Sequence, residues 1–481
     1  MRRKEAKNYL YNLAYQFVSI IYPIVLTPYT ARIFGADGVG DYSFTVAINT
    51  LFTLSLTCVG RYGFREISYS RGDRKAESKS FWEVQILRFI LLIFLSLGYL
   101  LLTFHSGKYK FLFLAQTISL LYVFFDIAWY WQGKENFKRT AIISIIDKIL
   151  MLILVFLFVK NKDDLALYAF LISLVSCFGS FALWLGLHKE IGIPDNINIR
   201  KHIKSCILIS IPFIIIELYS FIDKTMIGLI ANDSFENGYY EQTIKITRII
   251  MVIITSMSLI KAPRHSEFAK NNKRSELVTS LHESFSFMLF LGLPITFGLC
   301  LIADKCVPVF LGDGYEKVVI LMYLYSPFVI LHGFVDVMAN QYFIPSKQQN
   351  KYTVAVGISC LVNIALNCVL ISRLGAIGAI IATVISETVG LMVLVRFSRG
   401  IISLKKIIME NWQFLLAAVV MSGICLTVSL LINPGQFTEI MIQILLGIIV
   451  YFIFLTVCRQ KYFMGLVSLL YNEVQRKTGR K

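Results

Sequence analysis

The sequence predicts an all-α polytopic membrane protein with about fourteen transmembrane helices. Of its 481 residues, 56% are hydrophobic and only 16% are charged, and the mean hydropathy is +0.67, which is not typical of soluble domains. Its apolar runs are close in length to the roughly 20 residues that a helix needs to cross about 30 Å of hydrocarbon. Because these runs are continuous and do not alternate with polar residues, they exclude a β-barrel.

A window of this length divides the chain into fourteen expected spans. They lie near residues 9–33, 41–60, 82–104, 109–131, 141–159, 165–187, 205–230, 239–260, 281–303, 317–343, 353–372, 375–395, 411–432 and 437–458. The first span lacks a small-residue cleavage site, so we interpret it as a retained helix and not as a signal peptide.

The basic residues give the orientation of these spans. With the N-terminus in the cytoplasm, most of the 47 lysines and arginines fall on cytoplasmic segments along the whole chain, as the positive-inside rule requires. Both termini are therefore expected in the cytoplasm. The net charge of +17 is then a topological signal, with some attraction to anionic membrane lipid, and a nucleic-acid partner is excluded.

Two pairs of similar segments indicate an internal repeat. Residues 31–48 resemble residues 227–246, and residues 124–141 resemble residues 334–354, with Asp126 matching Asp336. Both separations are about 200 residues, so six spans are repeated. Since six is even, the copies are parallel and related by a pseudo-two-fold axis along the membrane normal, which places a substrate site near the midplane between them.

The repeat defines the expected domains: an N-lobe at 1–190 with spans 1–6, a C-lobe at 191–404 with spans 7–12, and a third part at 405–481 with spans 13–14 and a cytoplasmic tail.

Basic side chains within apolar spans are the candidates for substrate binding, because an unpaired charge there costs roughly 2.5–3.5 kcal/mol and by default faces a bundle interior or a water-filled cavity. In order of preference they are Arg248, Lys245, Lys224, Lys148 and Arg32. Arg32 and Arg88 lie near the ends of their spans, so we expect both to reach a membrane interface rather than the lumen, and we expect replacement of Arg88 by alanine to have a mild effect.

Acidic residues within spans are candidates for ion coupling: Asp223, Glu241, Glu217, Asp126 and Asp336. Two structural alternatives stay open. In the first, Glu241 and Lys245, at i and i+4, form an ordinary ion pair that holds the seventh and eighth spans together. In the second, Asp126 and Asp336 form hydrogen bonds between helices and have no role in transport. The nine cysteines contain no CxxC pair, so neither a disulfide framework nor a zinc site is expected. No other metal and no cofactor are expected.

The segment around spans 7 and 8 resembles a known family, the bacterial Wzx-type flippases of O-antigen and capsule repeat units. This family belongs to the superfamily that includes MATE exporters and lipid II flippases. The resemblance lies in Asp223-Lys224-x-Met226-Ile227-Gly228, Gly238-Tyr239-Tyr240, Lys245-Ile246-x-Arg248-Ile249 and Pro263-Arg264-x-Ser266. Lys261 and His265 depart from the apolar residues expected in the last motif.

The resemblance implies a flippase that moves undecaprenyl-pyrophosphate-linked oligosaccharide across the bacterial cytoplasmic membrane by alternating access. It would be coupled to protons, sodium or the membrane potential and work with other polysaccharide export or polymerase proteins. The sequence leaves two alternatives. An ion-coupled drug antiporter of the MATE-like branch would more naturally have twelve spans and a less basic interior. A membrane enzyme is disfavoured, because no loop carries paired carboxylates or a nucleophile with its base.

Overall fold

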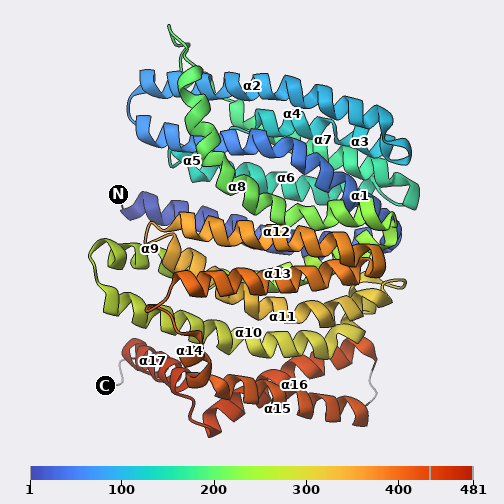
Figure 1. Cartoon of the computed structure of the whole chain (residues 1–481), viewed down its shortest axis with the longest axis vertical. Coiled ribbons are helices and arrows are strands. Elements are labelled where there is room, and N and C mark those ends of the chain that lie inside the picture. Colours follow the sequence, from blue (N-terminus) through green and yellow to red (C-terminus); the bar gives the residue numbers. More distant parts are fainter. Residues whose placement is uncertain (1, 433–434, 479–481) are drawn as a thin grey trace. The chain divides into compact units, whose positions relative to one another are not determined.

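The computed structural model describes residues 2–432 and 435–478, and the regular elements of this part of the chain are helices (Figure 1). The predicted all-α membrane class is confirmed. The chain forms two compact units, Met1–Glu241 and Gln242–Lys481. The expected lobe boundaries at 190 and 404 stay a prediction.

Unit 1 begins with α1 and ends at the first turns of α9. Its elements are α1 (Arg2–Ser70), α2 (Arg74–His105), η1 (Gly107–Tyr109), α3 (Lys110–Gln116), α4 (Ile118–Phe125), α5 (Ala128–Gly133), α6 (Phe137–Phe158), η2 (Lys162–Asp164), α7 (Leu165–Trp184), η3 (Leu187–Lys189), α8 (Arg200–Met226), the π-helical turn η4 (Ile227–Ala231) and the start of α9 (Ser234–Lys270). Within it, α1 packs on α2, α6 and α8, and α7 packs on α4 and α6.

Unit 2 contains the rest of α9 and the following helices. They are α10 (Arg274–Leu311), α11 (Glu316–Met338), the π-helical turn η5 (Ala339–Phe343), α12 (Gln349–Leu374), α13 (Ala376–Phe397), α14 (Leu404–Glu410), α15 (Trp412–Leu431), α16 (Gln436–Val457) and α17 (Lys461–Thr478). Helix α13 packs on both α11 and α12, α10 packs on α11, and α15 and α16 pair with each other and with α10.

The predicted count of fourteen spans is not confirmed. The described residues contain twelve helical segments long and apolar enough to cross a membrane, or thirteen if the bent pair Arg200–Leu208 and Ser210–Ala231 is one span. Two expected spans, 9–33 and 41–60, lie in the single segment Ala14–Ser70. That segment is not one continuous helix, because Gly35 breaks it at φ 67° and ψ 178°, a conformation that favours glycine.

The first pair of repeated segments meets at two glycines. A Cβ atom on Gly40 would lie 1.7 Å from the Ser234 carbonyl oxygen, and one on Gly238 would lie 1.8 Å from the Ala36 carbonyl oxygen. Only glycine permits such a close approach of two backbones. The glycine after each turn thus packs on the other segment.

The fourth expected span, 109–131, is broken inside the apolar region. It is divided into α3, α4 and α5, with Asp126 and Ile127 outside the helices. The last carbonyls of α4 would lack partners there, at high cost in a membrane. Side chains donate hydrogen bonds to the carbonyl oxygens of four successive residues. Arg88 donates to the carbonyls of residues 123 and 126, Gln85 to the carbonyl of residue 124, and Trp184 to the carbonyl of residue 125.

The expectation for Arg88 was therefore wrong. Its side chain is only 1% exposed, and its guanidinium lies among backbone carbonyls, not at a membrane interface. A guanidinium with five donors can satisfy several acceptors at once. Arg88 is thus part of the structure that allows the span to break, and its loss is expected to be severe.

Candidate functional site

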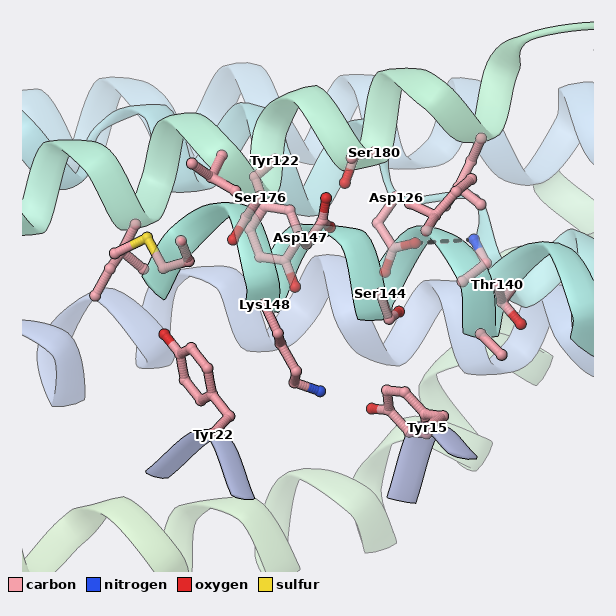
Figure 2. A pocket seen from close by; sticks show the side chains of 18 of the residues that line it. Tyr15, Tyr22, Tyr122, Asp126, Thr140, Ser144, Asp147, Lys148, Ser176 and Ser180 are labelled. Atoms are coloured by element: carbon pink, nitrogen blue, oxygen red, sulfur yellow. Dashed lines mark hydrogen bonds between the residues drawn. The ribbon is translucent and has the colours of Figure 1, made fainter. Parts of the chain in front are cut away.

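A polar cavity of about 600 Å³ lies within unit 1, a volume typical of small-molecule sites. Its walls come from α1, α4, α5, α6 and α7, and its charged residues are Asp126, Asp147 and Lys148. Figure 2 shows these three side chains with Tyr15 and Tyr22 of α1 and Tyr122 of α4. Since the surrounding helices are long and apolar, this is a polar chamber at membrane depth.

Lys148, predicted as a substrate-binding residue, lies in this cavity. Its Nζ atom donates a hydrogen bond to the Ser19 hydroxyl at 2.7 Å and lies 4.3 Å from the centre of the Tyr15 ring. This distance is within the range of a cation–π contact. Both partners come from α1, so Lys148 of α6 connects these two walls.

Asp126, predicted as an ion-coupling residue, lies at the break of the span. Its Oδ1 atom accepts a hydrogen bond from the Ala128 amide at 2.9 Å, which satisfies one of the free N–H groups at the start of α5. The broken helix thus brings a carboxylate and two helix ends to the cavity wall, an arrangement that membrane transporters use at binding sites.

Asp147 is the second carboxylate of the cavity. It lies against Gly179 of α7, where a Cβ atom would be 2.0 Å from its Oδ2 atom. The carboxylate interacts electrostatically with Lys148 and Asp126. Glycine at 179 therefore leaves the space that Asp147 occupies.

Lys224 and Glu241, both predicted, form an ion pair elsewhere in unit 1. Their side chains are only 12% and 10% exposed, and Ser43 donates a further hydrogen bond to Glu241 at 3.0 Å. The neighbouring Asp223 accepts a hydrogen bond from the Tyr240 hydroxyl at 2.6 Å. Glu241 thus has a partner from α8 as well as one from α1.

The remaining predicted residues of unit 1 are Glu217 and Arg32. Glu217 pairs with Arg61 at 3.2 Å, and both side chains are partly exposed. The Arg32 side chain is exposed.

The predicted residues of unit 2 lie on α9 and α11. Lys245 is half-buried and Arg248 is exposed; Arg248 interacts electrostatically with His332. Asp336 accepts hydrogen bonds from Ser258 and, at 2.7 Å, from the Asn340 amide. His332 contacts the buried Glu387 at 2.8 Å.

Sequence reasoning missed the tyrosines and Asp147 as site residues. Tyr15 and Tyr22 are seven residues apart on α1, so they share one helix face. Thr140, Ser144, Asp147 and Met151 have the same kind of spacing on α6 and all line the cavity. This polar stripe on a long apolar helix was the signal that could have identified the cavity wall.

Unit 2 contains an apolar groove of about 470 Å³. Its walls come from α9, α10, α15 and α16, and they include Phe290, Pro294, Ile444, Ile448 and Phe452. The groove is suited to a hydrocarbon chain, because nearly all of its lining is aliphatic or aromatic.

Two family models match the sequence. One, described as "Polysaccharide biosynthesis protein", matches residues 6–269, and one described as "Lipid II flippase MurJ" matches residues 239–451. The chain is 24% identical over 394 residues to a protein of Escherichia coli (strain K12) named "Putative O-antigen transporter", covering 78% of this chain and 93% of that protein. It is 22% identical over 233 residues to "Probable low-salt glycan biosynthesis flippase Agl15" of Haloferax volcanii, covering 48% of this chain and 49% of that protein.

Solved structures show the same fold. A structure of the lipid II flippase MurJ in an inward closed conformation matches 95% of this chain and 100% of that chain, with a TM-score of 0.77 and 19% identity. An inward-facing multidrug resistance transporter of the MATE family matches 82% of this chain and 94% of that chain, with a TM-score of 0.63 and 16% identity. At these identities the likeness shows the fold alone.

Proposed function

We propose, since the chain belongs to the polysaccharide biosynthesis protein family, that it is a flippase for undecaprenyl-pyrophosphate-linked oligosaccharide repeat units. It would move them from the inner to the outer leaflet of the bacterial plasma membrane for capsule, O-antigen or exopolysaccharide export. Both termini would lie in the cytoplasm, and other polysaccharide export and polymerase proteins would supply or receive the substrate.

The observation that carries this proposal is the presence of two chemically opposite binding spaces in one membrane protein. The cavity of unit 1 is lined by charged and hydroxyl groups, whereas the groove of unit 2 is almost entirely apolar. A lipid-linked glycan has both parts: a polar headgroup that must leave water and a hydrocarbon tail that need not. The groove beside α15 and α16 would hold part of the tail.

The pyrophosphate would bind to basic side chains, because Lys and Arg replace the hydration of phosphate through charge-assisted hydrogen bonds. We propose Arg248, Lys245, Lys224 and Arg32 for this role, and Lys148 for binding the glycan part of the same substrate. Arg248 leads because its exposed guanidinium is available to a ligand. Lys224 already pairs with Glu241, so its contribution would require that pair to loosen during transport.

Ion coupling would use acidic groups that change partner or protonation during alternating access between an N-lobe and a C-lobe. Asp223, Glu241, Glu217, Asp126 and Asp336 are the proposed residues. Each has a donor in the present structure: Tyr240, Lys224, Arg61, the Ala128 amide and Asn340, respectively. A proton or sodium ion would compete with these donors.

A drug antiporter of the MATE-like branch is the weaker alternative. The MATE transporter structure matches 82% of the chain, whereas the lipid II flippase structure matches 95%. A polar cavity with two carboxylates and one lysine also differs from the mostly apolar sites that bind drug-sized molecules.

Deletion of the gene tests the function. The deletion strain is expected to accumulate undecaprenyl-linked repeat units on the inner leaflet and to lose surface glycan, and the wild-type gene should reverse both effects. Normal surface glycan and no accumulation would reject the proposal.

Complementation with Arg248→Ala tests the phosphate site. We expect surface glycan to fall at least tenfold at unchanged protein level, because a ligand phosphate loses its charged donor. Arg396→Ala removes another exposed arginine, at the end of α13, and should complement fully. Normal glycan with Arg248→Ala would contradict the assignment.

A further inference from the structure

Several hydroxyl groups line the cavity of unit 1. Among the described residues, no side-chain hydrogen-bond partner is found for the hydroxyls of Tyr15, Tyr22, Tyr122, Ser144, Ser176 and Ser180, although all six line the cavity. Serines in helices commonly bond to a carbonyl of the preceding turn, as Ser19 and Ser173 do in this unit. The cavity hydroxyls therefore offer both donors and acceptors to a ligand.

The Asp147 carboxylate adds a strong acceptor to this set. No hydrogen-bond donor to it is found among the described residues, and its position is fixed by the absence of a side chain at Gly179. A carboxylate at membrane depth without donors is costly. A ligand that brings two adjacent donors to its two oxygens would relieve that cost.

The charges of the cavity disfavour a phosphate. Its lining has two carboxylates, Asp126 and Asp147, against the single lysine Lys148, and Lys148 is already held by Ser19 and the Tyr15 ring. A pyrophosphate would face repulsion from both acids. A neutral polyol would not, and its hydroxyls can donate to carboxylates and accept from Lys148, tyrosine and serine.

We propose that this cavity is a sugar subsite, which binds one or two neutral sugar rings of the glycan headgroup and excludes its pyrophosphate. The inference rests on the proposed function for the identity of the substrate. Asp147 accepts hydrogen bonds from adjacent ring hydroxyls, Lys148 donates to a third, and the phenol and serine hydroxyls complete the shell. The volume of about 600 Å³ limits the site to a small part of a repeat unit.

The experiment is a titration of the purified full-length protein in detergent by calorimetry. One probe is the free oligosaccharide released by mild acid from the lipid-linked intermediate of the deletion strain, and the other is undecaprenyl pyrophosphate without sugar. Asp147→Asn is expected to weaken oligosaccharide binding at least tenfold and to leave undecaprenyl pyrophosphate binding within twofold of wild type. The matched control is Asp163→Asn, at an exposed aspartate outside the cavity, which should change neither affinity.

Gly179→Ala provides a second variant that keeps every charge. Its added Cβ atom would overlap the Asp147 carboxylate, so it should displace that group and weaken the oligosaccharide tenfold as well. Unchanged oligosaccharide affinity in Asp147→Asn, or equal loss of both probes, would overturn the subsite. Failure of the proposed function would appear separately, as a deletion strain that accumulates no lipid-linked glycan and yields no probe; oligosaccharide from chemical synthesis would then still test the cavity.

Discussion

Asp126 and Asp336 occupy matching places in the two repeats, yet the structure uses them differently. At Asp126 the span breaks, and the carboxylate caps the next helix through the Ala128 amide. At Asp336 the helix continues to Met338, with the Ala339 amide bonded to the carbonyls of residues 335 and 336, and the carboxylate binds side chains of α9 and η5. The aspartate therefore accepts a hydrogen bond from the backbone in unit 1 and from side chains in unit 2.

The partner helices explain this difference. Helices α2 and α10 begin at Arg74 and Arg274, so Arg88 and Met288 lie at the same place in each. Both side chains are 1% exposed, but Arg88 binds the carbonyls of the broken α4, whereas Met288 packs against Gly333 of the unbroken α11. A broken span needs a buried donor beside it, and a continuous span needs only an apolar contact.

Met288→Arg should have the largest effect. The guanidinium would enter the apolar core of unit 2 beside Gly333, which lies within the helix α11, and an uncompensated buried charge costs about 3–5 kcal/mol. We expect almost no monodisperse protein after detergent extraction, measured by size-exclusion chromatography. Near-normal yield would show that unit 2 also has acceptors at this position; Met288→Leu is the control.

Arg88→Met should be the next in size. This variant gives unit 1 the methionine that unit 2 has at the matching position. It removes the hydrogen-bond donor to the carbonyls of residues 123 and 126, and each unsatisfied buried acceptor costs about 1–3 kcal/mol of stability. The melting temperature should fall clearly, as measured by tryptophan fluorescence. A melting temperature equal to that of wild type would mean that the break does not depend on Arg88.

Asp126→Ala and Asp336→Ala should have smaller and unequal effects. Loss of the hydrogen bond from the Ala128 amide to Asp126 costs about 1 kcal/mol, and α5 should fray at the cavity wall. Loss of Asp336 leaves the Ser258 and Asn340 side chains, which can turn to other acceptors. Hydrogen exchange of the backbone amides of residues 128–133 and 339–343 measures these effects directly. We expect faster exchange at residues 128–133 in Asp126→Ala. We expect no change at residues 339–343 in Asp336→Ala.

The smallest effect concerns the loop that follows α5. Lys134 pairs with Glu77 at 3.0 Å and with Glu190 at 2.6 Å. Burial alone would lower the pKa of Lys134, but the hydrogen bonds to these two acids outweigh it and raise the pKa. Because a raised lysine pKa stabilises the fold below the unfolded value of about 10.4, the contribution should be constant from pH 6 to 9 and be lost only at higher pH.

Lys134→Met tests this contribution. It should lower the melting temperature by a few degrees, by the same amount at pH 6 and pH 9. A difference between wild type and variant that changes within this range would contradict the ion pairs as its cause.

The positions of individual residues show what the sequence could and could not predict. Lys148 and Asp126 stand out in the sequence as charged residues within spans, and both line one cavity; their predicted roles stay predictions. Asp147 was recognised as a charge in a span but not as a site residue, because its exposure depends on Gly179, a residue 32 positions away that only packing brings beside it. Arg88 was misjudged, since nothing local to α2 reveals that α4 ends beside it.

The sequence by itself determined the membrane class, the approximate spans and the similarity of two halves, because hydrocarbon thickness and helical rise act on composition along the chain. The predicted number of spans differs from the number in the described residues because helices bend at Gly35 and near Ser210. Tertiary structure alone decided which charged side chains bind backbone groups, which form ion pairs and which line a cavity. These roles depend on which carbonyl, acid or hydroxyl another helix presents, and that geometry is created only when the helices pack.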